Sequence, residues 1–187
     1  MKIERFALAV TLGLALAVLP GCSGSSSSTD TPAAVFLSVE IEEGPADWPV
    51  DTATDLVIGR MRILSQAKSP TGDLSQQQDV TLTEWVVTPY RTDGGTKASP
   101  EWRNFYTVYV PAGGNADLEN YRIYPAEFFR QLPLVQLFPE NGGYDLETGQ
   151  PFIRQRLHIE VFGKTVAGRR ISVAFDVTIR FFYAGGL

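Results

Sequence analysis

Apolar and polar residues alternate one by one along much of this chain, which is the pattern of β-strands that bury one face. The alternation is clearest in residues 170–182, where a large apolar side chain occupies every odd position from Ile171 to Phe181. It predicts a strand there, with Ser172, Asp176 and Arg180 on the opposite face. Similar alternation predicts strands at residues 35–42, 56–64, 80–90, 105–110 and 156–162.

Helical periodicity is weak by comparison. After residue 34 the best helical candidate is 125–132, where Pro125 suits a first helical position and Pro133 would end the helix. We expect at most one or two turns there, inside a long crossing at 121–139 that is punctuated by proline. Strands without helices between them predict an all-β domain, a single antiparallel sandwich of about seven strands.

The last part of the chain indicates which kind of β-sandwich to expect. Residues 163–169 have the length of a hairpin connection and are followed by the strong strand at 170–182 and a short tail. This arrangement, over residues 150–183, resembles the end of an immunoglobulin-like domain, which implies an immunoglobulin-like sandwich. The Cys…Trp…Cys pattern of antibody domains is absent, because Cys22 is the only cysteine. No internal repeat is visible, so we expect one domain at residues 34–187.

The N-terminus has the layout of an export signal. Lys2 and Arg5 supply positive charge, and residues 6–19 are uncharged and almost wholly apolar. A membrane-spanning helix needs about 20 residues, and this run is shorter. We therefore interpret residues 1–21 as a signal peptide with a helical core.

A second signal ends this segment. The sequence Leu19-Pro20-Gly21-Cys22 resembles the lipobox of bacterial lipoproteins. The resemblance implies that Cys22 receives a diacylglycerol thioether, becomes the N-terminus after cleavage, and holds the protein at the membrane of the cell envelope. Because Ser23 stands where an Asp would resemble an inner-membrane retention signal, the resemblance favours the outer membrane in a cell with two membranes. The acylated cysteine and a disordered, Ser-rich linker make up residues 22–33.

Charge limits the class of partner. The formal net charge of −5, with no strong Lys/Arg cluster, argues against nucleic-acid binding. Arg154, Arg156, Arg169 and Arg170 lie near the final hairpin and form either a small positive patch or simply a soluble strand surface. With one cysteine there is no disulfide, so the stability of the domain depends on its apolar core.

The residues that usually carry catalysis are scarce. His158 is the only histidine, and it alternates with apolar neighbours on the outer face of a predicted strand. Asn115, Asp117 and Glu119 place oxygen atoms at alternate positions in a Gly-rich loop, which suits calcium, but the EF-hand spacing is missing. We therefore expect no catalytic residue, no metal site and no cofactor, and we do not expect an enzyme.

Aromatic residues are the better candidates for recognition. Trp102, Tyr106 and Tyr121 lie in an aromatic-rich stretch, and Trp102 follows Pro100 in an expected loop, where it would be exposed. Trp48 has a similar setting before Pro49, whereas Trp85 lies mid-strand and is assigned to the core. The stretch either packs a core without disulfides or forms a binding surface.

These observations predict a lipid-anchored cell-envelope protein with a non-catalytic binding or scaffold domain. Its expected partner is another envelope protein, contacted through Trp48, Trp102, Tyr106 and Tyr121. The alternatives are a carbohydrate-binding module that uses exposed Trp and Tyr rings, and a structural subunit of a surface assembly joined by strand addition.

The anchor can be tested directly. Cys22→Ala removes the thiol that the lipobox resemblance assigns to the lipid, so the protein should leave the membrane fraction and lose incorporation of labelled fatty acid. Fractionation and metabolic labelling measure both properties. Ser23→Ala is the matched control and should stay in the membrane; a Cys22→Ala variant that also stays there would contradict the anchor.

Overall fold

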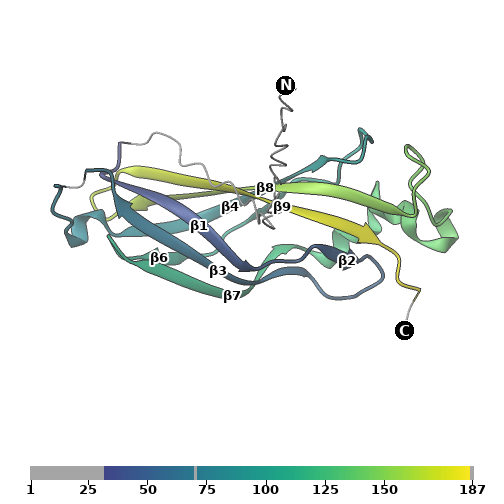
Figure 1. The fold of residues 1–187 in the computed structure, drawn as a ribbon, viewed down its shortest axis with the longest axis horizontal. Coiled ribbons are helices and arrows are strands. Elements are labelled where there is room, and N and C mark those ends of the chain that lie inside the picture. The colour runs from purple at the N-terminus through teal and green to yellow at the C-terminus, as the bar shows by residue number, and fades with distance from the viewer. Residues whose placement is uncertain (1–31, 70, 186–187) are drawn as a thin grey trace, which may run out of the picture.

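The computed structural model describes residues 32–69 and 71–185 (Figure 1). Within these residues the chain forms β-strands and short 3-10 helices with no α-helix, so the all-β prediction is confirmed. The predicted signal peptide, Cys22 and most of the 22–33 linker lie outside the described residues. The strands are β1 (Val35–Glu43), β2 (Asp47–Pro49), β3 (Leu56–Ala67), β4 (Val80–Arg91), β5 (Trp102–Asn104), β6 (Val108–Val110), β7 (Asn115–Tyr124), β8 (Phe152–Thr165) and β9 (Arg170–Phe182).

The strands form two sheets. The three-stranded sheet has the order β1-β3-β7, and the six-stranded sheet has the order β2-β9-β8-β4-β5, with β6 also paired to β4. Neighbouring strands are antiparallel except that β2 runs parallel to Arg180–Phe182 of β9. The chain therefore changes sheets between β1 and β2, over residues 44–46.

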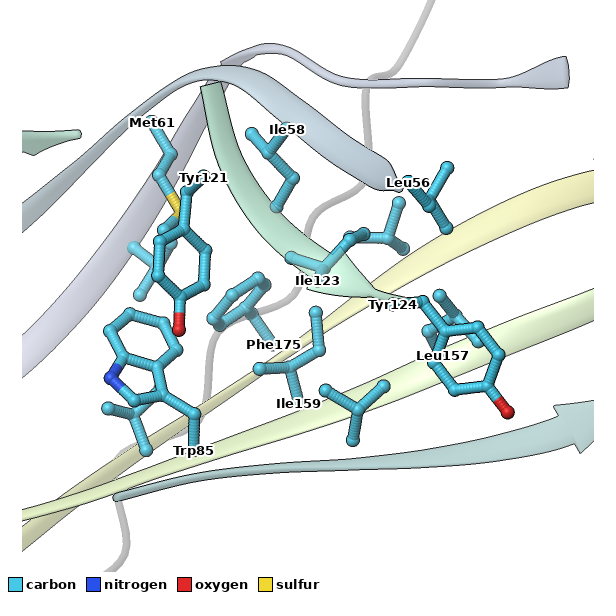
Figure 2. Packing of buried hydrophobic residues seen from close by; sticks show 14 of the residues in the cluster. Leu56, Ile58, Met61, Trp85, Tyr121, Ile123, Tyr124, Leu157, Ile159 and Phe175 are labelled. Carbon is cyan, nitrogen blue, oxygen red and sulfur yellow. The ribbon is translucent and has the colours of Figure 1, made fainter. Parts of the chain in front are cut away.

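One apolar core holds the two sheets together. The alternation read from the sequence places the odd-numbered side chains of β9 inward, and all of them from Ile171 to Phe181 are buried. Trp85 of β4 is fully buried, as its place in the sequence predicts, and its ring centroid lies 4.4 Å from that of Tyr121 in β7. Figure 2 shows these two rings facing each other across the core.

Strand β7 is not predicted by the sequence. Asn120 has a positive φ of 50°, and two consecutive exposed residues, Glu119 and Asn120, separate the buried Leu118 from the buried Tyr121. This irregularity breaks the period of two, so the strand reads as a loop. The expectation that Asn115, Asp117 and Glu119 lie in a loop is therefore wrong, because they lie on β7.

Two other predicted elements have different limits. Only the second half of the strand expected at 105–110 forms, because β6 begins at Val108 and residues 105–107 are a loop after β5. The helical candidate at 125–132 is a 3-10 helix over Ala126–Arg130, followed by others over Leu134–Leu137 and Pro139–Asn141. Their buried side chains, Phe129, Leu134 and Leu137, extend the core over this crossing.

The first described residues already contribute to the core. Ala33, which the sequence assigns to the linker, is buried, as is Val35 at the start of β1. Across residues 32–69 and 71–185, no helix is long and apolar enough to cross a membrane.

Candidate functional site

Two of the four predicted aromatic residues meet at one surface. The ring of Tyr106, in the loop between β5 and β6, lies 5.4 Å from that of Tyr121, measured between centroids. Tyr121 in turn contacts Trp85, so three rings run in a row from the core to the surface. Tyr106 is 47% exposed and Tyr121 only 7%.

The core also fixes the backbone of this loop. The indole N–H of Trp85 donates a hydrogen bond of 3.0 Å to the backbone carbonyl of Tyr106. Because Trp85 is held by packing on all sides, this bond gives the loop a defined position. Phe105, the residue before Tyr106, is 73% exposed.

A hollow of about 450 Å³ lies between this loop and β7. Its aromatic walls are Phe105, Tyr106 and Tyr121, and the rest of its lining is largely polar. Aromatic faces beside hydrogen-bonding groups can recognise a protein or a sugar. The lining consists of Asn104, Phe105, Tyr106, Asp117, Leu118, Glu119, Asn120, Tyr121 and Arg122.

The Tyr121 hydroxyl is buried and makes no hydrogen bond of ordinary geometry to another described residue. Burial is the largest influence on it and raises the pKa of this hydroxyl, while the neighbouring Asn104 side chain opposes that shift only in part. The phenol is therefore neutral at physiological pH and keeps its proton for donation.

Trp102 does not have the exposure that the sequence predicts. It lies on β5, paired with Val87 of β4, and is half-buried against the core. The guanidinium of Arg122 lies 5.3 Å from the centre of its ring, a distance typical of a cation–π contact. Trp102 therefore supports the surface near the hollow without lining it.

Trp48 lies apart from the other candidates. It is on β2, which is the outermost strand on one side of the six-stranded sheet, whereas β5 is outermost on the other. Trp48 is half-buried and packs against the core. The structure therefore brings Tyr106 and Tyr121 together, adds Phe105, and leaves Trp48 out. The sequence does not single out Phe105, because the alternation at 105–110 assigns it to a strand, whereas it lies in the loop between β5 and β6.

The most deeply buried charges hold two loops together. Arg91, at the end of β4, has a side chain only 2% exposed, and its guanidinium lies 2.7 Å from Asp93 Oδ1 and 2.7 Å from Asp145 Oδ2. Burial acts to raise the pKa of Asp93 and Asp145, but hydrogen bonds from Arg91 and other donors outweigh it and hold both pKa values below the ordinary range.

Glu147 extends this arrangement to the neighbouring loop. Its carboxylate accepts hydrogen bonds from the backbone N–H groups of Thr96, at 2.8 Å, and Lys97, at 3.0 Å. Because these ionised groups satisfy one another, the cluster joins the segment after β4 to the segment before β8. We assign it a structural role.

The arginines near the final hairpin do not form one patch. Arg154 is opposite Arg180 near one end of the β8–β9 pair, whereas Arg170 is opposite Lys164 at the other end, beside Arg169 in the turn. His158 lies between these ends, on the outer face, and its Nδ1 is 2.8 Å from Asp176 Oδ1.

Asn115 and Asp117 of β7 are engaged with protein groups. Asp117 Oδ1 accepts a hydrogen bond of 2.7 Å from Arg62 Nε, and Asp117 Oδ2 accepts one of 3.1 Å from the Asn115 amide. In the part of the chain that the structure describes, no group of three His, Cys, Asp or Glu side chains is arranged to hold a metal ion.

Comparison with known proteins adds no relative to this description. No family model, no curated protein and no solved structure matches the chain.

The buried charge cluster gives a testable pH dependence. Arg91→Met leaves Asp93 and Asp145 buried without their cation, so it should lower the free energy of unfolding by about 3–5 kcal/mol at neutral pH. The folded-state pKa values of both carboxyls are depressed, so their stabilisation is present above about pH 4 and is lost as pH falls through the folded values. Urea unfolding at several pH values measures this.

The variant should show a weaker loss of stability between neutral and acid pH than the wild-type chain. Arg103→Met, which removes an exposed ion pair with Glu84, is the matched control. It should cost less than about 1 kcal/mol. Equal effects of the two substitutions would contradict the assigned role of Arg91.

Proposed function

We propose that this chain is a lipid-anchored envelope protein whose non-catalytic domain binds another envelope protein through the loop that carries Phe105 and Tyr106. The observation that supports this most is the exposure of Phe105 on a loop whose backbone is tied to buried Trp85. A large aromatic side chain on a fixed loop loses little conformational freedom on binding and is typical of interface anchors.

The order of the strands supports an immunoglobulin-like sandwich as the form of this domain. In that fold the first, second, fourth and fifth main strands share one sheet, and the third, sixth and seventh share the other; the described residues contain no counterpart of the fourth. Here β1, β3 and β7 form one sheet, and β4, β8 and β9 lie in the other. Under this assignment, β1 and β2 together correspond to the first strand, which passes from one sheet to the other. β5 and β6 are additional strands paired with β4.

The anchoring proposal rests on the resemblance of Leu19-Pro20-Gly21-Cys22 to a lipobox. Lipid on Cys22 would attach the protein to the outer membrane in a cell with two membranes. The Ser-rich residues that follow would separate the domain from the lipid and allow it to meet a partner.

A carbohydrate is the second candidate ligand, and one observation favours it. The side chains of Asn104, Asp117 and Asn120 line the hollow beside Tyr106 and Tyr121, which gives hydrogen-bonding groups next to aromatic faces. The separation of Trp48 from Trp102 argues against a flat platform built from both tryptophans.

Photo-cross-linking in living cells tests the proposed surface. A photoreactive phenylalanine analogue at position 105 should yield a discrete protein adduct after irradiation, because this side chain would lie inside the interface. The same analogue at Tyr144, which is 46% exposed in another loop, is the matched control and should yield none.

Mass spectrometry of the adduct identifies the partner. A polysaccharide adduct from position 105 would transfer the site to the carbohydrate alternative. No adduct from position 105, or the same adduct from both positions, would contradict the proposed surface.

A further inference from the structure

The edge of β9 is open over most of its length. β2 pairs only with Arg180–Phe182, and the other side of β9 is paired to β8 throughout. Among the described residues, no strand pairs with the second edge of β9 over residues 173–178. An uncovered edge of this kind can accept an added strand.

The backbone groups that face this edge can be named. Arg180 donates its N–H to the Ala46 carbonyl, and the Phe182 carbonyl accepts from Val50, so even-numbered residues face the edge. The pairing of β9 with β8 has no register shift, so the same parity holds along the strand. The N–H and C=O groups of Ala174, Asp176 and Thr178 therefore point outward.

The other outer strands carry features that discourage strand addition, and β9 does not. β5 and β2 have three residues each, and β2 contains Pro49. β7 has its irregularity at Asn120, and β1 has one between Ile41 and Glu43. Short length, proline and bulges are the usual protections of exposed edges. From 173 to 178, β9 is regular, contains no proline and carries a single charge, at Asp176.

A groove of about 950 Å³ runs beside this edge. It lies between β9 and β1, which belong to different sheets but run close together (Figure 1). Its apolar part is formed by Val39, Phe175 and Val177, whose side chains continue into the core. A strand added to β9 would point every second side chain into this groove.

The rim of the groove is acidic. Glu40, Glu42, Glu43 and Asp176 line it, and Arg156 is the one cation among the described residues of its lining. Glu40, Glu42 and Glu43 are all exposed. Glu42 is engaged by Arg60 and Arg62, at 3.8 and 3.5 Å, and Asp176 by His158, at 2.8 Å. The rim therefore favours a ligand with positive charge.

We propose that the open edge of β9 accepts an extended segment of a partner protein in which apolar residues alternate with lysine or arginine. Its backbone pairs with Ala174, Asp176 and Thr178, its apolar side chains enter the groove, and its cations meet the acidic rim. This surface is separate from the Phe105–Tyr106 loop, so either proposal can fail without the other.

Two other occupants fit less well. A second copy paired antiparallel about Phe175 would bring Arg170 of one copy to Arg180 of the other, where β2 already pairs with the edge and where like charges oppose each other. The chain's own linker at 23–32 has no large apolar residue for the groove and no cation for its rim.

Amide hydrogen exchange on the full chain tests the edge. Without a ligand, the amides of Ala174, Asp176 and Thr178 should exchange much faster than those of Val173, Phe175 and Val177, which face β8. A synthetic peptide of alternating Val and Lys at millimolar concentration should slow the three edge amides about tenfold or more. A peptide of alternating Val and Glu is the matched control and should not.

Two variants make the result specific. Ala174→Pro removes an outward N–H while sparing the bonds to β8, so protection by the Val-Lys peptide should disappear from the folded variant. Asp176→Lys should weaken protection, and Glu101→Lys, which changes the charge equally beside β5, should not.

Each contrary result overturns the proposal. Slow exchange of the edge amides without ligand would show that the edge is covered. Protection that rises with protein concentration alone would assign the edge to a second copy. No protection by the Val-Lys peptide, or equal protection by both peptides, would refute the proposed ligand chemistry.

Discussion

The contact between Trp85 and Tyr121 is the interaction on which the rest of this structure depends. It joins β4 of one sheet to β7 of the other, at the centre of a domain that has no disulfide to hold its sheets together (Figure 2). The same indole donates a hydrogen bond to the Tyr106 backbone. Trp85 therefore connects the apolar core to the exposed aromatic loop, and the packing of the core fixes the backbone position of that loop.

The change of sheet between β1 and β2 has the second large consequence. β1 pairs with β3, and β2 pairs only with the end of β9. The rest of the β9 edge is therefore open, and a groove lies between it and β1. The domain thus offers two surfaces of different chemistry: an aromatic loop beside a polar hollow, and a strand edge with an acidic rim. Both surfaces are consistent with the proposed binding of partner proteins.

The sequence predicts the regular strands well because each of them buries one face. The bounds of β9 agree with the alternation of its side chains, and β3 and β4 begin where the pattern places them, whereas β8 extends beyond the predicted 156–162 at both ends. The sequence does not predict β7 because the break in alternation at Glu119 and Asn120 interrupts that pattern, although its buried Leu118 and Ile123 are ordinary core residues. β2 is too short to show any period.

The site is harder to predict than the strands because its geometry comes from pairs far apart in the sequence. Nothing local to Trp48 indicates that β2 attaches to β9, on the side of the sheet opposite β5. The meeting of Tyr106 with Tyr121 likewise depends on how two sheets pack. Aromatic composition indicated the region, and the tertiary structure selected Phe105 and Tyr106 within it.

Hydroxyl-radical footprinting of the protein in intact cells tests the central claim most directly. Oxidation of Phe105 and Tyr106 is compared with that in the purified chain, and Tyr144 serves as an internal reference for radical dose. The account predicts that Phe105 and Tyr106 are protected several-fold in cells while Tyr144 is unchanged. Equal oxidation of all three residues in both samples would contradict the claim that this loop is the partner-binding surface.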